Sequence, residues 1–347
     1  MRIRDYGITI GQLPTGPLNR ISDVPGVTVG HTTIADDTHN TGVTVVLPCQ
    51  DNPFANKLPC ASFVLNGFGK TAGLVQIEEL GTLETPIALT NTLNVGLVHD
   101  AMVEYMIRRC ASDGISLCSV NPVVCECNDA ALNDIQHRAV KQAHVFSAIA
   151  SACKEFEEGA VGCGRGMTCH GLKGGVGSSS RKVVLDDTEF TVGVLVETNH
   201  GKLRDLLIDQ QPVGMRIYNQ VGMDKPDKGS CIVILATDIP LSDRQLRRVI
   251  KRCSVGLARL GSFIGQSSGE VFIGFSTSNR IPDAPQRAIM DMKYVSDTCL
   301  DPVFRAAAEC TEESVLNSLT AAEDVTGFNA TTRVSLNHFM NNLYSQQ

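Results

Sequence analysis

The chain has 347 residues, of which 43% are hydrophobic and 19% are charged, with a formal net charge of −7. This composition is that of a globular protein with a sizeable core, in one large domain or two smaller ones. The acidic balance and the scattered Lys and Arg residues argue against a nucleic-acid partner. We expect no membrane segment, because no apolar run reaches bilayer length. The N-terminal stretch lacks the apolar region of a signal peptide, so we expect a cytoplasmic protein.

Thirteen cysteines are the unusual feature of the composition. An odd number without a signal peptide argues against a secreted disulfide framework. Cys125 and Cys127 form a C-x-C pair, but no C-x-x-C pair and no second pair at zinc spacing accompany it. We therefore expect reduced thiols that serve as small core side chains, with no metal site and no cofactor.

Short β-branched runs separated by turn signals dominate the first part of the chain. Strands are expected at residues 23–34, 41–48, 61–65 and 115–124. Residues 86–96 are expected to lead from a strand into a helix that begins near Leu97, and residues 131–155 are expected to be helical. In the second part, strands are expected at residues 188–198, 231–237 and 271–276.

Two helices are expected in the last third of the chain. Ser242 is a plausible N-cap for the first, whose apolar stripe consists of Leu246, Val249, Ile250, Cys253, Leu257 and Leu260. The second is expected from Asp301 to about Asp324, with Gly327 as a stop signal. Many strands with a few long helices, without regular βαβ alternation, favour an α+β sandwich of sheets covered by helices.

Glycine is densest at residues 161–181. The stretch matches neither the phosphate-binding P-loop nor the dinucleotide fingerprint, so tight turns at a packed surface are the favoured interpretation over a nucleotide site. His31, His170 and His200 each lie beside a glycine, which favours loop positions. No H-E-x-x-H spacing and no G-x-S-x-G elbow is present, so a zinc protease and an α/β-hydrolase are both disfavoured.

The junction Gly229–Ser230 raises a sharper question. A polar loop at residues 221–229 runs directly into serine and an apolar β-branched run. In the plain interpretation Gly229 ends a loop and Ser230 begins a strand. In the alternative, the bond between them breaks and Ser230 becomes an N-terminus, whose hydroxyl is a nucleophile and whose α-amine, with a pKa of about 7.7–8.0, is its base. Glycine suits such a break because it accepts strained geometry.

A second serine lies near a carboxylate just before an expected strand. Ser268 and Glu270 are two residues apart, so their side chains share one face of an extended segment. A hydroxyl and a carboxylate placed in this way can form a relay to a third group. The pair is a weak signal alone and gains weight beside Gly229–Ser230.

Long ordered blocks carry a family resemblance over nearly the whole chain. The chain resembles the β-aminopeptidase family of self-processing N-terminal serine hydrolases, typified by the L-aminopeptidase/D-Ala-esterase/amidase. The blocks that carry the resemblance are residues 16–34, 66–96, 122–135, 161–181, 192–201, 227–241, 265–277 and 311–327. The resemblance implies a four-layer αββα sandwich, like that of N-terminal-nucleophile hydrolases but with different connectivity.

The resemblance also implies how the chain matures. One domain over residues 1–347 would be cut between Gly229 and Ser230 into a larger piece, 1–229, and a smaller piece, 230–347. The two pieces would stay together, and the implied assembly is a homo-oligomer, a tetramer of such pairs.

Roles for individual residues follow from the resemblance alone. Ser230 would be the nucleophile, supported by Ser268 and Glu270. The side-chain amide of Asn199 and the backbone N–H of Asn128 would form an oxyanion hole. Glu126 would bind the free amino group of the substrate, and Asn128 would make the pocket more polar.

The leading hypothesis is thus a self-processing serine aminopeptidase. It would release small N-terminal residues from short peptides, amides or esters, with β- and D-amino acids among the candidates. An acyltransferase of the ornithine-acetyltransferase type is an alternative, but that class is expected to use an N-terminal threonine, which Ser230 contradicts. A catalytically silent structural relative is a third reading, and the retained set of Ser230, Ser268, Glu270 and Asn199 argues against it.

Overall fold

The computed structural model describes residues 1–222 and 229–344, the last four by their backbone alone. Its strands are β1 (Thr28–Ala35), β2 (Asn40–Leu47), β3 (Asn56–Gly67), β4 (Thr82–Leu83), β5 (Ile87–Asn91), β6 (Val123–Cys127), β7 (Thr168–Cys169), β8 (Leu172–Lys173), β9 (Gly175–Leu185), β10 (Thr188–Asn199), β11 (Ser230–Thr237), β12 (Gly269–Ser276), β13 (Ile281–Pro282), β14 (Val325–Gly327) and β15 (Thr331–Arg333). Its α-helices are α1 (Leu74–Leu80), α2 (Val95–Ser112), α3 (Gln142–Ala150), α4 (Val213–Val221), α5 (Asp243–Ile250), α6 (Cys253–Arg259), α7 (Asp301–Ala321) and α8 (Asn337–Tyr344).

Two main sheets form the centre of the fold. The smaller has the strand order β1-β2-β5-β6, and the larger has the order β13-β3-β12-β11-β10-β9, with β4 paired to β3. Neighbouring strands are antiparallel except for the parallel pairs β5–β6 and β11–β12. This mixture of pairings agrees with the absence of a regular βαβ pattern in the sequence.

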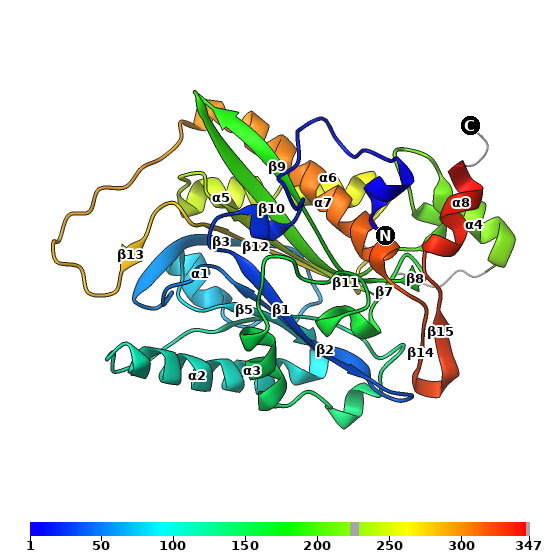
Figure 1. Ribbon diagram of the computed structural model, residues 1–347, viewed down its shortest axis with the longest axis horizontal. Coiled ribbons are helices and arrows are strands. Elements are labelled where there is room, and N and C mark those ends of the chain that lie inside the picture. Colours follow the sequence, from blue (N-terminus) through cyan, green and yellow to red (C-terminus); the bar gives the residue numbers. More distant parts are fainter. Residues whose placement is uncertain (223–228, 345–347) are drawn as a thin grey trace.

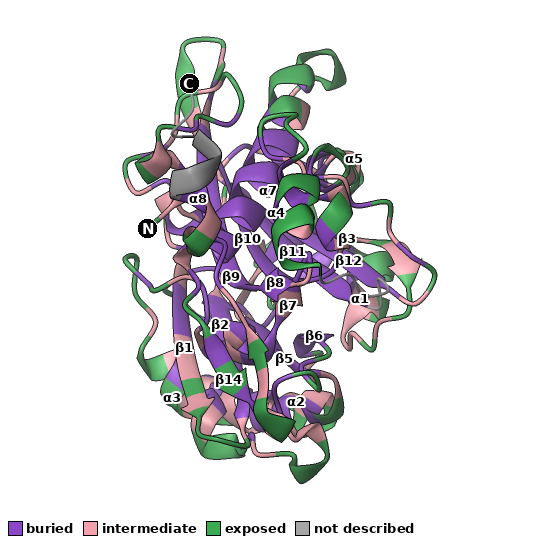
Figure 2. Cartoon of the chain, turned by 90° about the vertical axis from the view of Figure 1, so that its right-hand side faces the viewer, coloured by how far each residue is buried: buried purple, intermediate pink, exposed green. Residues whose placement is uncertain are grey.

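Three apolar cores separate four layers. Helices α2 and α3 pack on the outer face of the smaller sheet, where Val98, Met102 and Val145 are buried with Val43 and Val45. A second core lies between the two sheets and contains Leu89, Cys125, Ile232 and Ile273. Helices α5, α6 and α7 cover the larger sheet over a third core. Figure 1 shows the helices outside and the sheets inside, and Figure 2 shows that the strands are mostly buried. The expected αββα layering is confirmed.

The helix expected after Ser242 is present but divided. The Ser242 hydroxyl accepts a hydrogen bond from the Gln245 backbone N–H at 3.2 Å, which confirms the cap. Residues 251 and 252 interrupt the helix between α5 and α6. The apolar stripe nevertheless continues across the break, because all six of its residues are fully buried: Leu246, Val249, Ile250, Cys253, Leu257 and Leu260.

Three expected boundaries were wrong. Within residues 115–124 only the last two are strand, as the start of β6. Within residues 131–155 the α-helix is confined to Gln142–Ala150, and Cys153 instead exchanges two backbone hydrogen bonds of 3.0 Å with Val29. Helix α7 ends at Ala321, and Gly327 instead ends β14. The ends of these elements depend on pairing with segments that are distant in the chain, and a local sequence pattern does not contain this information.

Strand β9 occupies the second half of the glycine-rich stretch, where turns were expected. Its small residues let α7 lie directly on the sheet: Ser179 donates a hydrogen bond of 2.7 Å to the carbonyl of Cys310. The first half contains a short 3-10 helix at Gly162–Gly166 and the tight β7–β8 hairpin, which agrees with the expected turns. It wraps around the buried Lys173, whose Nζ donates to the carbonyls of Gly164 and Met167 at 2.9 Å. No helix in the described part of the chain is long and apolar enough to cross a membrane.

Candidate active site

Ser230 is the first residue of β11, at the centre of the larger sheet. In the strand register it lies opposite Asn199 of β10 on one side and opposite Gly269 of β12 on the other. It is 6% exposed, whereas Ile232, on the same face of the strand, is buried in the core between the sheets. Strand alternation therefore turns the Ser230 side chain toward the inter-sheet layer, at its edge.

Gly229 lies against the end of β10. A Cβ at position 229 would stand 1.5 Å from the Asn199 carbonyl oxygen and 2.7 Å from the His200 Cα, so any other residue here would force the backbone to shift. The Gly229 carbonyl accepts a hydrogen bond from the Gly269 N–H at 3.2 Å. Most of the loop expected at residues 221–229 lies outside the described residues, since 223–228 are not described.

Two hydrogen bonds fix the side-chain amide of Asn199. Its Oδ1 accepts from the Thr168 backbone N–H, and its Nδ2 donates to the Asn128 carbonyl oxygen, both at 2.9 Å. Asn199 is 7% exposed, and Asn128 is exposed at the end of β6. The structure thus brings together the two residues that the resemblance assigns to an oxyanion hole.

Ser268 and Glu270 form a buried pair beside the junction. The Ser268 hydroxyl donates to the Glu270 carboxylate, and both residues are fully buried. Gly269, which lies between them, is the residue in register with Ser230. The side chain of Asn66 holds the preceding turn by donating to the carbonyls of Gly265, at 2.9 Å, and Ser268. The shared face predicted from the two-residue spacing is present.

Glu126 lies near the end of β6, on the smaller sheet. Its carboxylate accepts from the Lys70 backbone N–H at 2.9 Å and from the Thr92 hydroxyl, and the residue is 1% exposed. Lys70 follows the end of β3, whose Asn66 is paired with Glu270. This short connection links Glu126 to the strand beside Ser230.

A further carboxyl group, that of Glu197, was not predicted. It lies on β10 two residues before Asn199 and is fully buried beside the Cys163 thiol. Burial raises its pKa well above the ordinary value, and the nearby charges of Glu126 and Asp129 add to this effect. Burial also raises the pKa of Asp129 to about 6. The sequence signal was an acid directly after the apolar run at residues 192–196 of β10.

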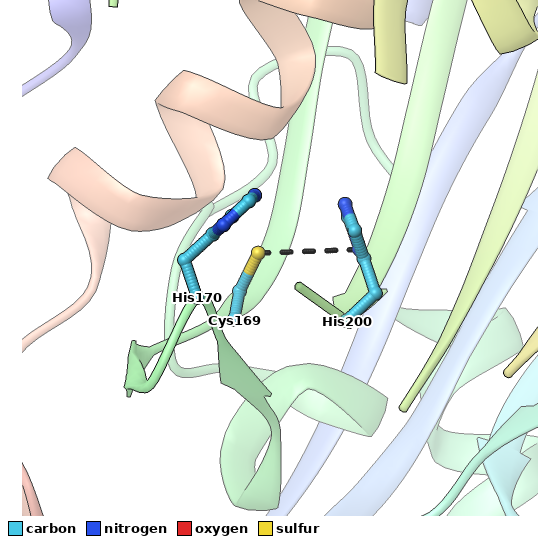
Figure 3. Close-up of side chains that lie close together, drawn as sticks. All are labelled: Cys169, His170 and His200. Carbon is cyan, nitrogen blue, oxygen red and sulfur yellow. Dashed lines mark hydrogen bonds between the residues drawn. The ribbon is translucent and has the colours of Figure 1, made fainter. Parts of the chain in front are cut away.

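Cys169, His170 and His200 gather at the end of β7 and just after the end of β10 (Figure 3). All three are buried. The two histidines lie outside the strands, as expected, whereas His31 lies within β1. Both ring nitrogens of His31 lie within hydrogen-bonding distance, Nδ1 of the Thr44 hydroxyl at 2.9 Å and Nε2 of the Glu157 carbonyl at 3.1 Å, which accounts for its place in a strand.

Comparison with known proteins places this chain among peptidases. The profile of Peptidase family S58 matches residues 19–333. The chain is 38% identical to the "Beta-peptidyl aminopeptidase BapA" of Sphingosinicella xenopeptidilytica, over 94% of this chain and 87% of that protein.

Two solved structures have the same fold throughout. The PH0078 protein of Pyrococcus horikoshii superposes with a TM-score of 0.94 at 41% identity, over 100% of both chains. The L-aminopeptidase D-Ala-esterase/amidase of Ochrobactrum anthropi superposes with a TM-score of 0.91 at 35% identity, over 99% of both chains. The latter is described as a prototype for the serine aminopeptidases and a new variant of the Ntn hydrolase fold.

Proposed function

We infer that this chain, which belongs to peptidase family S58 and is a serine aminopeptidase, makes its own nucleophile by cutting the bond between Gly229 and Ser230. The family that the sequence blocks resemble is confirmed. The observation that carries the proposal is the position of this junction at the start of the central strand β11, between Asn199 and Gly269.

The proposed cut is an acyl shift followed by hydrolysis. Ser230 Oγ attacks the Gly229 carbonyl carbon; the new C–O bond forms, the C–N bond breaks, and the Ser230 nitrogen takes up the hydroxyl proton. Water then hydrolyses the ester to release the Gly229 carboxylate and restore the hydroxyl. The Gly269 N–H supports this step, because it already donates to the carbonyl oxygen on which negative charge would develop.

The two pieces, residues 1–229 and 230–347, would remain one domain. Strand β11 of the smaller piece pairs with β10 of the larger piece along its whole length, from Ser230 to Thr237. Helix α7, also in the smaller piece, packs on β9 and β10 of the larger. Separating the pieces would expose both the sheet edge and this core, so cleavage leaves the fold intact.

In the mature enzyme, the Ser230 hydroxyl would attack the substrate carbonyl and the free α-amine would accept its proton. Asn199 Nδ2 carries two hydrogens, so it can serve the substrate oxyanion while it keeps its bond to Asn128. The Asn128 backbone N–H would be the second donor. The buried pair of Ser268 and Glu270 would orient the amine of Ser230 from the neighbouring strand.

Glu126 would bind the ammonium group of the substrate, which would make the enzyme an exopeptidase. The proposed substrates are short peptides, amides and esters with a small N-terminal residue. Because relatives are named for β-peptidyl and D-Ala substrates, β- and D-residues are included. The proposed chemistry uses only side chains, backbone groups and water.

We further propose that the enzyme works in the cytoplasm as a tetramer of cleaved pairs. All thirteen cysteines are free thiols, and ten of them are buried, which suits a reducing compartment. The tetramer rests on the family resemblance alone. Light scattering of the purified protein gives its mass, and a monomeric pair in solution would refute this part.

The first experiment is the intact mass of the purified wild-type protein beside Ser230→Ala. We expect two wild-type masses, the smaller beginning at Ser230, and a single full-length mass in the variant. The wild type should hydrolyse L-alanyl and β-alanyl p-nitroanilides, and the variant should hydrolyse neither. A cut variant, or an uncut variant with full activity, would overturn the assignment of the nucleophile. An uncut, inactive wild type would favour the catalytically silent alternative.

A further inference from the structure

One thiol and two imidazoles, all able to bind a metal ion, lie close together next to the proposed active site. None of them has a role in the mechanism proposed above. Cys169, His170 and His200 each present one ligand atom, and these atoms all lie within 4.8 Å of one another. The Cys169 Sγ is 4.0 Å from His200 Nδ1. The two imidazole rings meet edge to face, with centroids 5.5 Å apart (Figure 3).

A tight turn places two of the three ligands. Cys169 ends β7 and pairs with Leu172 of β8, so His170 and Gly171 form a two-residue hairpin loop. Their φ angles are +48° and +76°, as a type I′ turn requires. A histidine is an uncommon choice for the first of these left-handed positions, where Asn, Asp or Gly is usual. The turn is joined to the third ligand, because the His170 N–H donates to the His200 carbonyl at 2.7 Å.

The ring of His170 is also held in the manner typical of a metal ligand. Its Nδ1 donates a hydrogen bond of 2.9 Å to the Lys202 carbonyl, which makes Nε2 the basic nitrogen of the ring. Metal-binding histidines usually donate their other N–H to a carbonyl or carboxylate in this way. His200 Nε2 is buried and has no hydrogen-bond partner among the described residues. Its Nδ1 lies 4.0 Å from the Cys169 Sγ.

We propose that Cys169, His170 and His200 form a binding site for a thiophilic divalent cation of the Zn²⁺ class. One thiolate with two imidazoles is a donor set that Zn²⁺ favours, and a water molecule would supply the fourth ligand. On binding, the ion replaces the proton of the Cys169 thiol, which passes to solvent. In a tetrahedral zinc site the donors are roughly 3.3–3.8 Å apart, so the ligand atoms must approach one another by up to about 1.5 Å.

The site would act as a clamp. It would tie the β7–β8 hairpin to the residue that follows Asn199 on β10. That segment faces the cleavage junction, since Gly229 packs against the backbone of both Asn199 and His200. The sequence did not predict the site, because His200 lies 30 positions after His170 in the chain and only the fold brings the two together.

Co²⁺ is the probe for the first test, because cobalt–thiolate bonding gives a charge-transfer band and tetrahedral cobalt gives intense visible bands. The reference protein carries serine at the three exposed cysteines, Cys118, Cys153 and Cys299, to remove adventitious thiols. It is titrated with Co²⁺ after treatment with a chelator. We expect one equivalent to bind, with both spectral features. An absence of binding, or binding without the thiolate band, would overturn the proposal.

Two variants of this reference locate the ion. Cys169→Ser should abolish the charge-transfer band and weaken binding at least about tenfold. His170→Asn keeps a residue that tolerates the left-handed turn and should weaken binding comparably. Zn²⁺ should raise the thermal midpoint of the reference but not of either variant. Retained binding and stabilisation in Cys169→Ser would place the ion elsewhere and refute this site, leaving the three side chains as packing residues.

Discussion

Asn199 and Ser230 face each other across the antiparallel pair β10–β11, and both hydrogen-bonding groups of the Asn199 amide are engaged, by Thr168 and by Asn128. The donor proposed for the oxyanion is thus oriented before any substrate arrives. Such preorganisation is the feature that makes oxyanion-hole donors effective, because no reorientation is needed as charge develops.

Replacing Asn199 with alanine should therefore reduce kcat about 100- to 1000-fold with little change in KM. The reason is that the donor acts on the oxyanion of the transition state more than on the ground-state carbonyl. The measurement is steady-state hydrolysis of a β-alanyl p-nitroanilide, on protein whose mass shows complete cleavage. A thermal midpoint measured alongside separates lost catalysis from lost folding. A kcat near that of the wild type would remove Asn199 from the mechanism.

Gly229→Ala tests the close approach at the junction. The added Cβ would need to occupy space 1.5 Å from the Asn199 carbonyl oxygen, so the backbone on one side must move. We expect self-cleavage to slow at least about tenfold, because a small misplacement of the attacked carbonyl costs reaction rate steeply. The fraction of cut chain is followed by mass against time after synthesis.

Gly96→Ala is the matched control, since a Cβ at this helical position of α2 meets nothing within 4 Å. It should cut at the wild-type rate and gain up to about 1 kcal/mol of stability from the better helix propensity of alanine. If Gly229→Ala also cut at the wild-type rate, the proposed constraint on the junction would be wrong.

The predictable part of the molecule was the part encoded in local periodicity. The spacing of two residues placed Ser268 and Glu270 on one face, and the structure pairs them. The apolar stripe after Ser242 predicted which face of α5 and α6 is buried. Strand β9 was not predicted, because its serines and glycines lack the β-branched pattern of a typical strand. Small residues are nevertheless required there, since α7 lies in contact with the strand.

The candidate site divides in the same way. The junction between Gly229 and Ser230 could be identified as a candidate cleavage site from the local sequence. The roles of Asn199 and Glu126 came only from the family resemblance. Glu197 and the group of Cys169, His170 and His200 were missed, since their properties arise from burial and from contacts between distant segments. A single-sequence pattern carries no information on which side chains meet across two strands.

Glu126→Gln tests recognition of the substrate's amino group. The variant keeps the size of the side chain but loses the charge that would pair with an ammonium ion. We expect kcat/KM for a free-amine substrate to fall about 10- to 100-fold, which corresponds to about 1.4–2.8 kcal/mol. Self-cleavage at Gly229–Ser230, which involves no substrate ammonium group, is the internal control. An equal slowing of self-cleavage would mean that Glu126 supports the fold of the site and does not bind the amine.

Glu197 gives the enzyme a stability that depends on pH. Because burial raises the pKa of its carboxyl group, the folded chain holds this proton more tightly than the unfolded chain does. Stability is therefore greatest below the ordinary carboxyl pKa and falls as the pH rises above it, toward the raised value of the folded state. Glu197→Gln removes the titration. The thermal midpoint of the variant, measured relative to the wild type, should rise as the pH increases above the ordinary carboxyl pKa toward the raised value. Glu79→Gln, which replaces an exposed acid on α1, is measured over the same range as the surface control. A difference from the wild type that stays constant with pH for Glu197→Gln would mean that this carboxyl group does not titrate differently in the folded and unfolded chains.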